Sequence, residues 1–530
     1  MTVRSTAAPH SPELPIRSPH LWESLIAFVV LAGAYLLHAP NVLNTPVYVG
    51  NDGWIFNSIF VQLSHGVRLY AGIFDVSDPL YYYVYSVFER ILGLGGPMLC
   101  ETLISLSIIA VLLAIGRHLR LPTVITAMCT GICLLYLFSP AFYWPLNTYH
   151  LALLLFFTSL LLALHGRYGI SGVLFAASVF AKMPMVAFAP AILALPALRA
   201  APEWSDLWRR CRGWLFGVAI FTAALTCTLA VRGELSGYLT VIRVNLSLSA
   251  AFQRDLGVVN HPFHNFEGRV GTLCAFVMLG LTIGLSLIVV IRIARQFRAG
   301  RTQTGVVTRV ETAVMVATVF AGFAGAVILH VASWYGDFFE CLTPLFFLLP
   351  ISLALCLRSL NLRVGGRLAR TDPRGRALSL LGVVCLGGVM ILSGFVELAA
   401  LTGAPEPVSL GFTSAAWIDP TVSWCFDRYS FAHESTAYAS VGANEFATEC
   451  LVPANMHLVC PLFFQFPWFG SELLDQFKSC LATKPEVVFV VPLLNSTPSF
   501  VKEVTAILDD HFEEIGSCPP FEIWQRKPVK

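Results

Sequence analysis

Long runs of apolar residues alternate with short polar stretches from residue 22 to about residue 400. The first run, Trp22–Ala39, is about as long as a helix needs to cross the hydrocarbon core of a bilayer. The apolar stretch between Arg167 and Arg199 is broken by Lys182 and Pro184, which predicts two short helices or a re-entrant hairpin with Lys182 at its tip. Further spans are predicted at about Pro97–Gly116, Pro122–Phe138, Tyr149–His165, Arg212–Val231, Val270–Ile291, Glu311–Val331, Cys341–Leu357 and Leu378–Ala399. The pattern predicts a polytopic α-helical membrane protein with about eleven crossings.

The pattern changes in the last quarter of the chain, where polar residues dominate and every lysine other than Lys182 is found. The β-branched run Glu486–Val491 predicts a buried strand, and Phe521–Trp524 predicts another. Phe500–Phe512 carries apolar residues at helical spacing. We therefore expect a small α/β domain at 401–530.

The remaining segments complete the predicted domain organisation. Residues 1–21 are polar and rich in proline, which predicts a disordered tail. Residues 22–400 form the predicted transmembrane module, and residues 40–96 form its first large loop. No internal repeat is visible, which argues against an inverted-repeat transporter.

Composition supports the membrane assignment, since 56% of the 530 residues are hydrophobic and only 12% are charged. Soluble domains carry about a quarter charged residues. No basic stripe with interleaved aromatic residues is present, so a nucleic-acid partner is not expected. The fourteen cysteines form no CxxC pair, so a zinc ribbon is not indicated. Five of the cysteines lie in the polar tail, where one or two disulfides are plausible outside the cytoplasm: Cys425, Cys450, Cys460, Cys480 and Cys518.

The positions of the arginines predict the orientation, because cytoplasmic loops collect Lys and Arg. The loops that share the side of the amino terminus hold Arg117, Arg120, Arg167, Arg199, Arg209, Arg210, Arg212 and the clusters Arg292–Arg309 and Arg358–Arg376. This predicts a multi-pass protein of the plasma (inner) membrane with a cytoplasmic amino terminus. The loop 40–96, Lys182 and the C-terminal domain are then extracytoplasmic.

Ionisable residues are scarce inside the predicted spans and gather on the predicted outer side. The set comprises Asp52, Asp75, Asp78, Lys182, Arg232, Glu234, Arg243, Arg254, Asp255, His261, His264, Glu267, Arg269, Asp337 and Glu340. Ion-coupled carriers usually need such groups at mid-depth. The distribution favours chemistry on a substrate whose head group lies at the membrane surface.

The stretch Gly50–Gly95 contains the principal catalytic candidate, Asp52. Sugar transfer from a phosphate leaving group needs a base for the acceptor hydroxyl, and one carboxylate suffices for an inverting displacement. The alternative is that Asn51-Asp52-Gly53 is only a turn, which these residue types favour.

Cations on the same side are candidates for binding a donor phosphate. Lys182 could hold the phosphate of a lipid donor as a point charge, or it could be an interfacial anchor whose amine reaches the head groups. Arg243, Arg254 and Arg269 offer guanidinium forks that match phosphate geometry. An amphipathic surface helix would carry such arginines too.

Two further groups complete the candidates. His261 and His264 could bind a divalent metal cation, although their spacing is not a zinc signature and loop histidines are usually solvated. Tyr335 and Glu340 lie at a predicted outer mouth, where aromatic residues also serve as an interfacial belt.

Several of these residues fit a known pattern. An acidic residue after the first span, Gly66, Leu69-Tyr70 and Asp78-Pro79-Leu80-Tyr81-Tyr82 follow one another in the first loop. Lys182 and Pro184 follow the fifth span, and Tyr335, Leu342, Pro344 and Pro350 lead into a late one. Together they resemble the polyprenyl-phosphate-sugar-dependent transferases of the glycosyltransferase-C superfamily, nearest in layout to the protein O-mannosyltransferase and aminoarabinose-transferase types. The chain departs from the family where Asp52-Gly53 replaces an Asp-Glu pair and Asp78-Pro79 replaces a double proline.

The resemblance implies an integral membrane glycosyltransferase with a GT-C-like fold and an outward cavity. It would move one sugar from a polyprenyl-phosphate donor to an envelope glycan, lipid or protein acceptor, with Asp52 as the base. Asp78, Tyr81, Tyr335 and Glu340 are the expected substrate contacts. Two alternatives stay open: a lipid or sugar transporter, and a glycan ligase or polymerase with a lipid-diphosphate donor, which would use Arg254, His261 and His264.

Overall fold

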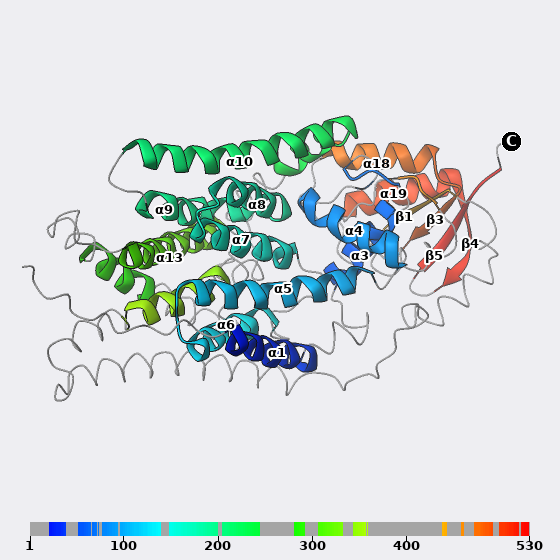
Figure 1. The fold of residues 1–530 in the computed structure, drawn as a ribbon. Helices are drawn as coiled ribbons and strands as arrows, with labels where there is room; N and C mark the ends of the chain where they lie inside the picture. The colour runs from blue at the N-terminus through cyan, green and yellow to red at the C-terminus, as the bar shows by residue number, and fades with distance from the viewer. Residues whose placement is uncertain are drawn as a thin grey trace, which may run out of the picture.

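A computed structural model describes the protein over residues 21–38, 51–64, 66–70, 73, 77–93, 96–138, 148–199, 204–243, 280–291, 306–331, 343–356, 358, 437–441, 457–460, 471–490, 498–518 and 521–528. Within these residues the chain forms a bundle of apolar helices with a small mixed sheet at one end (Figure 1). Two further helices lie between the bundle and the sheet.

The helices of the bundle follow the predicted spans closely. They are α1 (Leu21–His38), α5 (Gly96–His118), α6 (Thr123–Phe138), α7 (Thr148–Leu164), α8 (Tyr168–Ala181), η3 (Met183–Phe188), α9 (Ala189–Arg199), α10 (Trp204–Val231) and α13 (Val306–Val331). Residues 235–243, 280–291 and 343–356 are also helical. In the described part of the chain, two helices are long and apolar enough to cross a membrane, Gly96–His118 and Ser205–Val231, and the other apolar helices are shorter. The predicted span Leu378–Ala399 lies outside the described residues.

Helices α8 and α10 pack with their backbones in contact. A Cβ atom at Gly172 would lie 2.0 Å from the carbonyl oxygen of Trp214, and one at Gly217 would lie 2.0 Å from that of Gly169. Any larger side chain at either position would push the helices apart. The contact fixes the direction of α8, which carries the chain toward Lys182 at its C-terminal end, and α9 then returns it toward α10 (Figure 1).

The end of the bundle away from the sheet gathers several of the arginines that the charge pattern places on one side. Arg358 Nη1 donates to the carbonyl oxygens of Leu119 and Arg120, both at 2.9 Å, and Nη2 pairs with Glu311. The His118 and His165 rings meet at 4.3 Å between centroids, which brings the C-terminal ends of α5 and α7 together. We call this region the basic end, and the opposite region the sheet end.

Helices α3 (Asn51–Ser64) and α4 (Pro79–Leu92) occupy about half of the predicted first loop, residues 40–96. Asn51-Asp52-Gly53 is the first turn of α3 and not a separate turn, which corrects that alternative. Rings on one face of each helix pack together, as in the edge-on contact of Phe56 with Tyr81 at 5.3 Å. Their aromatic faces supply the burial that makes these short helices stable.

The C-terminal sheet has the strand order β2-β1-β3-β5-β4. Its strands are β1 (Ala437–Val441), β2 (His457–Leu458), β3 (Val487–Val490), β4 (Phe512–Cys518) and β5 (Phe521–Arg526). β1 pairs in parallel with β2 and β3, whereas β5 is antiparallel to β3 and β4. Helices α18 (Ser471–Thr483) and α19 (Pro498–His511) complete this α/β unit. The strands and the helix predicted from the sequence of the tail are β3, β5 and α19.

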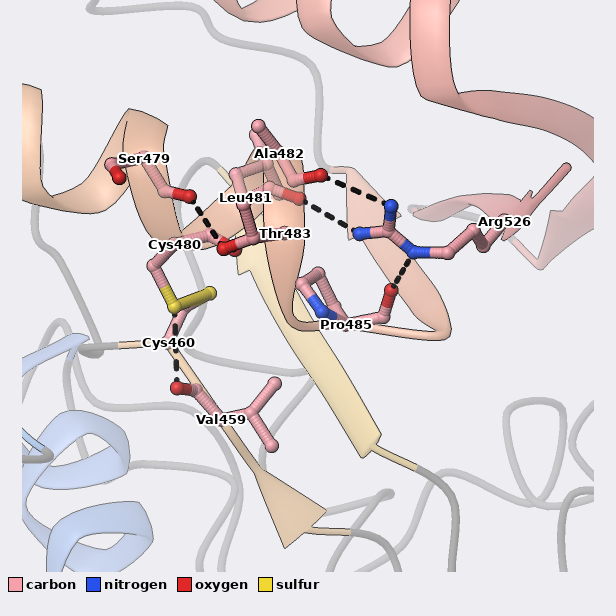
Figure 2. Close-up of a disulfide and its surroundings, with 9 residues drawn as sticks. All are labelled: Val459, Cys460, Ser479, Cys480, Leu481, Ala482, Thr483, Pro485 and Arg526. Atoms are coloured by element: carbon pink, nitrogen blue, oxygen red, sulfur yellow. Dashed lines mark hydrogen bonds between the residues drawn. A yellow bond between two sulfur atoms is a disulfide. The ribbon is translucent and has the colours of Figure 1, made fainter. Parts of the chain in front are cut away.

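A disulfide joins Cys460, just after β2, to Cys480 in α18 (Figure 2). Beside it, the guanidinium of Arg526 donates to the carbonyl oxygens of Leu481, Ala482 and Pro485, at 3.3, 3.0 and 2.7 Å. The C-terminal end of α18 is thus held covalently to β2 and by hydrogen bonds to β5. Arg526 satisfies carbonyls that a helix end leaves without intrahelical partners.

One buried hydrogen bond links the sheet to the bundle side. Gln62 Nε2 of α3 donates to the hydroxyl oxygen of Tyr438 in β1 at 3.1 Å. Tyr438 is fully buried and Gln62 nearly so. This bond from the C-terminal domain therefore helps to position α3, the helix whose first turn contains Asp52.

Candidate active site

Asp78 is a buried carboxylate at the sheet end whose two oxygens both accept hydrogen bonds. It immediately precedes α4, and Pro79 occupies the first helical position, where proline is favoured. Its Oδ2 accepts the backbone N–H of Met183 at 2.6 Å, and its Oδ1 accepts the hydroxyl of Tyr238 at 2.9 Å. Asp78 is only 4% exposed. It therefore ties three separate segments together at one point.

Lys182 lies at the junction between α8 and η3, in an extended backbone conformation that ends the first helix and begins the second. Its Nζ sits 4.5 Å from the centre of the buried Tyr149 ring at the start of α7. A cation on an aromatic face gains about 0.5–2 kcal/mol, depending on its exposure. Because Asp78 holds the next backbone N–H, the lysine is fixed on both sides.

Tyr238 connects this pair to the first loop. Its ring packs against Tyr70, with centroids 5.4 Å apart. Tyr70 has a φ of 60°, a left-handed conformation uncommon for a bulky residue, and its hydroxyl donates to the Ser77 carbonyl at 2.6 Å. Burial and the Asp78 carboxylate raise the pKa of Tyr238, so its hydroxyl stays protonated and continues to donate.

A second polar group lies beside the first. Arg232 Nε donates to Glu234 Oε1 at 2.9 Å, while Tyr83 of α4 donates its hydroxyl to Glu234 Oε2. Burial and Glu234 raise the pKa of Tyr83. The Arg232 guanidinium also lies 5.3 Å from the centre of the Tyr83 ring. The Glu234 side chain is fully buried, whereas that of Arg232 is 42% exposed, so the arginine presents positive charge to its surroundings.

The structure brings some of the predicted site residues together. Asp78 and Lys182 meet through the Met183 backbone N–H. Asp52 lies in the first turn of α3, and its side chain is outside the description. Arg243 ends the helical residues 235–243 and is exposed.

Tyr81 was expected to contact the substrate, and the structure places it among packed aromatic rings. It is fully buried among aromatic rings, with centroids 5.4 Å from Phe60 and 4.6 Å from Tyr85. In this position Tyr81 contributes to packing. Tyr83, two positions later, donates its hydroxyl to Glu234. Arg254, Arg269, His261, His264, Tyr335 and Glu340 lie outside the described residues. Within the described ranges, no three His, Cys, Asp or Glu side chains form a group that could hold a metal ion.

The sequence did not single out Tyr238, Tyr83 or Tyr149. Tyr149 and Tyr238 each lie near the end of an apolar segment, and Tyr83 belongs to the run Tyr81–Tyr83; interfacial aromatic residues are expected at both kinds of position. Only their hydrogen bonds and ring contacts with charged residues distinguish them.

No protein-family model matches the chain, and no curated protein matches it in sequence. Solved structures do align with it. The oligosaccharyltransferase of Archaeoglobus fulgidus, crystallised with a tethered acceptor peptide, aligns at 10% identity over 96% of this chain and 74% of its own, with a TM-score of 0.47. ArnT from Cupriavidus metallidurans bound to undecaprenyl phosphate aligns at 14% identity over 96% of this chain and 100% of its own, with a TM-score of 0.44.

The arrangement offers specific chemistry. The amine of Lys182 stands on an aromatic base at the end of apolar helices, and the half-exposed Arg232 guanidinium is a second cation at the same end. The carboxylates of Asp78 and Glu234 are buried and engaged in hydrogen bonds. Partly exposed positive charge beside buried, hydrogen-bonded carboxylates suits an anionic head group.

Proposed function

We propose that this protein is an integral membrane glycosyltransferase. It moves a single sugar from a polyprenyl-phosphate donor to an envelope glycan, lipid or protein acceptor at the sheet end of the bundle. Asp52 serves as the general base of an inverting displacement. Lys182 binds the donor phosphate, with Arg232 nearby as a second cation.

The observation that carries this proposal is the placement of Lys182. Its amine is held over Tyr149, and the following N–H is held by Asp78, where apolar helices end. A lipid-linked phosphate has its charge at this same boundary between apolar and polar surroundings. A cation fixed there beforehand can stabilise the negative charge that develops on the phosphate as the sugar departs.

Asp52 suits the role of base better than Asp78 does. Both oxygens of Asp78 already accept hydrogen bonds, and the side chain is 4% exposed, so an acceptor hydroxyl has little access to it. Asp52 belongs to the first turn of α3. The partial positive charge at a helix N-terminus favours an ionised carboxylate, which is the form that can take a proton.

We place the sheet end outside the cytoplasm. The Cys460–Cys480 disulfide is typical of oxidising compartments, and the arginines of the basic end fit the cytoplasmic side. Nucleotide sugars are made in the cytoplasm, so a lipid-linked donor is the expected source of the sugar. The membrane would then be the plasma (inner) membrane.

Donor choice tests the proposal. Purified protein is supplied with polyprenyl-phosphate sugars, nucleotide sugars and lipid-diphosphate oligosaccharides in parallel, and release of the free lipid phosphate is measured. We expect turnover only with the monophosphate-linked sugars. Efficient use of a nucleotide sugar would refute the proposal, and use of a lipid diphosphate alone would favour a ligase.

A further inference from the structure

A buried polar cluster joins three helices on the sheet side of the bundle, and the proposed chemistry does not use it. Glu101 of α5 pairs through Oε1 with Nδ1 of His150 in α7, and its Oε2 accepts the hydroxyl of Tyr85 in α4. Glu101 and Tyr85 are fully buried, and His150 is 2% exposed. We call these three residues the Glu101 cluster.

The cluster is connected to Lys182 through α7. His150 directly follows Tyr149, and both lie in the first turn of α7. The Tyr149 ring is the surface on which the Lys182 amine rests. Because neighbouring residues of a helix move together, the bond from His150 to Glu101 fixes the position of that ring.

A second connection passes through α4. Tyr85 lies about two helical turns beyond Asp78. Asp78 in turn holds the backbone N–H of Met183, next to Lys182. The Glu101 cluster is therefore connected to Lys182 along two routes. One runs through α7 and the Tyr149 ring, and the other runs through α4 and Asp78.

We propose that the Glu101 cluster is a positioning device that sets the geometry of the Lys182 pocket, an inference that rests on the proposed function. A buried carboxylate is costly unless it is paired and hydrogen-bonded, and apolar residues of similar size would often pack at least as stably. The hydrogen bonds of the cluster fix the positions of α4, α5 and α7 relative to one another along their axes, which we call their register. These helices carry the groups that surround Lys182.

The reactivity of Lys182 measures this positioning in the protein without substrate. Lys182 is the only lysine before Lys478, so its modification by an amine-reactive ester is easily followed by peptide mass spectrometry. We expect Glu101→Gln and Tyr85→Phe each to raise the labelling rate of Lys182 roughly fivefold, the shift that the loss of one typical hydrogen bond allows. The exposed Lys484 and Lys502 serve as internal references and keep their rates.

Thr102→Val is the matched control. Thr102 neighbours Glu101 and is buried, and its hydroxyl donates to the Met98 carbonyl of the same helix at 2.9 Å. This variant should leave Lys182 labelling unchanged. If it raises labelling as much as the cluster variants do, register is not the cause and the proposal is wrong.

The remaining outcomes are also decisive. If thermal unfolding shows that Glu101→Gln does not fold, the milder Tyr85→Phe, which keeps the ring, decides the question. Unchanged Lys182 labelling in a folded cluster variant overturns the proposal. In active protein, the KM for the lipid donor should rise by a similar factor while kcat changes less. Labelling needs no turnover, so failure of the proposed function would leave this test intact.

Discussion

The two ends of the bundle each contain an arginine paired with a glutamate, but the pairs are used differently. At the basic end, Arg358 binds Glu311 and two backbone carbonyls, and its side chain is 16% exposed. At the sheet end, Arg232 binds Glu234 through Nε, and its side chain is 42% exposed. The first guanidinium holds segments of the protein together, whereas the second is partly exposed to its surroundings.

The same contrast holds for the neighbouring groups. The basic end ties the C-terminal end of α5 to residues 311 and 358, which closes that end of the bundle. At the sheet end, the buried carboxylates and tyrosines hold Lys182 and Arg232 in place without covering them completely. A charged group whose partners all lie within the protein indicates a structural role. A charged group that neighbouring residues hold in place but leave partly exposed indicates a ligand site.

The largest effect is expected from Asp52→Asn, which tests whether the sheet end is catalytic. The amide keeps the shape of the side chain but cannot take a proton. We expect turnover to fall about a hundred- to ten-thousand-fold, with donor binding retained, as measured by single-turnover assays and equilibrium binding. Loss of donor binding that added divalent metal restores would make Asp52 a metal ligand instead of the base.

The next largest effect is expected on the pH dependence of stability, which should differ between Glu89 in α4 and Glu311 at the basic end. Glu89 of α4 has an oxygen with no hydrogen-bond partner among the described residues, and burial raises the pKa of this group to about 7 from 4.5. The folded state then holds the proton more tightly than the unfolded state does. The contribution of Glu89 to stability is therefore greatest below about pH 4.5 and falls as pH rises toward 7, by roughly 3 kcal/mol in total.

Glu89→Gln removes that penalty. Thermal unfolding in detergent should show the variant more stable than wild type at pH 8 and nearly equal to it at pH 5. Glu311→Gln at the basic end should be less stable at both pH values, because it weakens the pair with Arg358. A Glu89 variant that is destabilised at pH 8 would show that this carboxylate has a partner.

The smallest effects come from the same conservative change at both ends. Arg358→Lys keeps the charge but cannot reach two carbonyls and a carboxylate at once, so we expect a loss of about 1–2 kcal/mol in unfolding free energy. Arg232→Lys should cost less than about 1 kcal/mol, because the pair is partly exposed, but it should weaken donor binding a few-fold. Thermal unfolding and donor titration of both variants give the comparison. If Arg358→Lys weakened donor binding and Arg232→Lys lowered the unfolding free energy by about 1–2 kcal/mol instead, the ligand site would lie at the basic end.

The apolar pattern predicted the positions of most helices, because a helix that faces other helices or lipid needs a long apolar run. It did not predict α3 as a helix, since Asn51, Asp52 and Gly53 each favour turns, whereas α3 packs against α4 through contacts such as that of Phe56 with Tyr81. Lys182 was singled out by its residue type and position, whereas Asp78 was expected as a substrate contact through the sequence resemblance. Their partner Tyr238 is far away in sequence, and no local signal links it to Asp78. Glu101 was missed because a single carboxylate in an apolar run does not reveal the histidine and tyrosine that pair with it.

Binding of the donor phosphate at Lys182 is tested most directly by the affinity of the purified protein for a polyprenyl phosphate without sugar. It is titrated against wild type, Lys182→Ala at the sheet end and Arg120→Ala at the basic end. Because a hydrogen bond to a charged group contributes about 1.5–3 kcal/mol, we expect Lys182→Ala to weaken binding roughly ten- to hundredfold. Lys182→Arg should recover part of this loss, and Arg120→Ala should bind like wild type. Wild-type affinity in Lys182→Ala, together with weakened binding in Arg120→Ala, would place the phosphate at the wrong end and contradict the account.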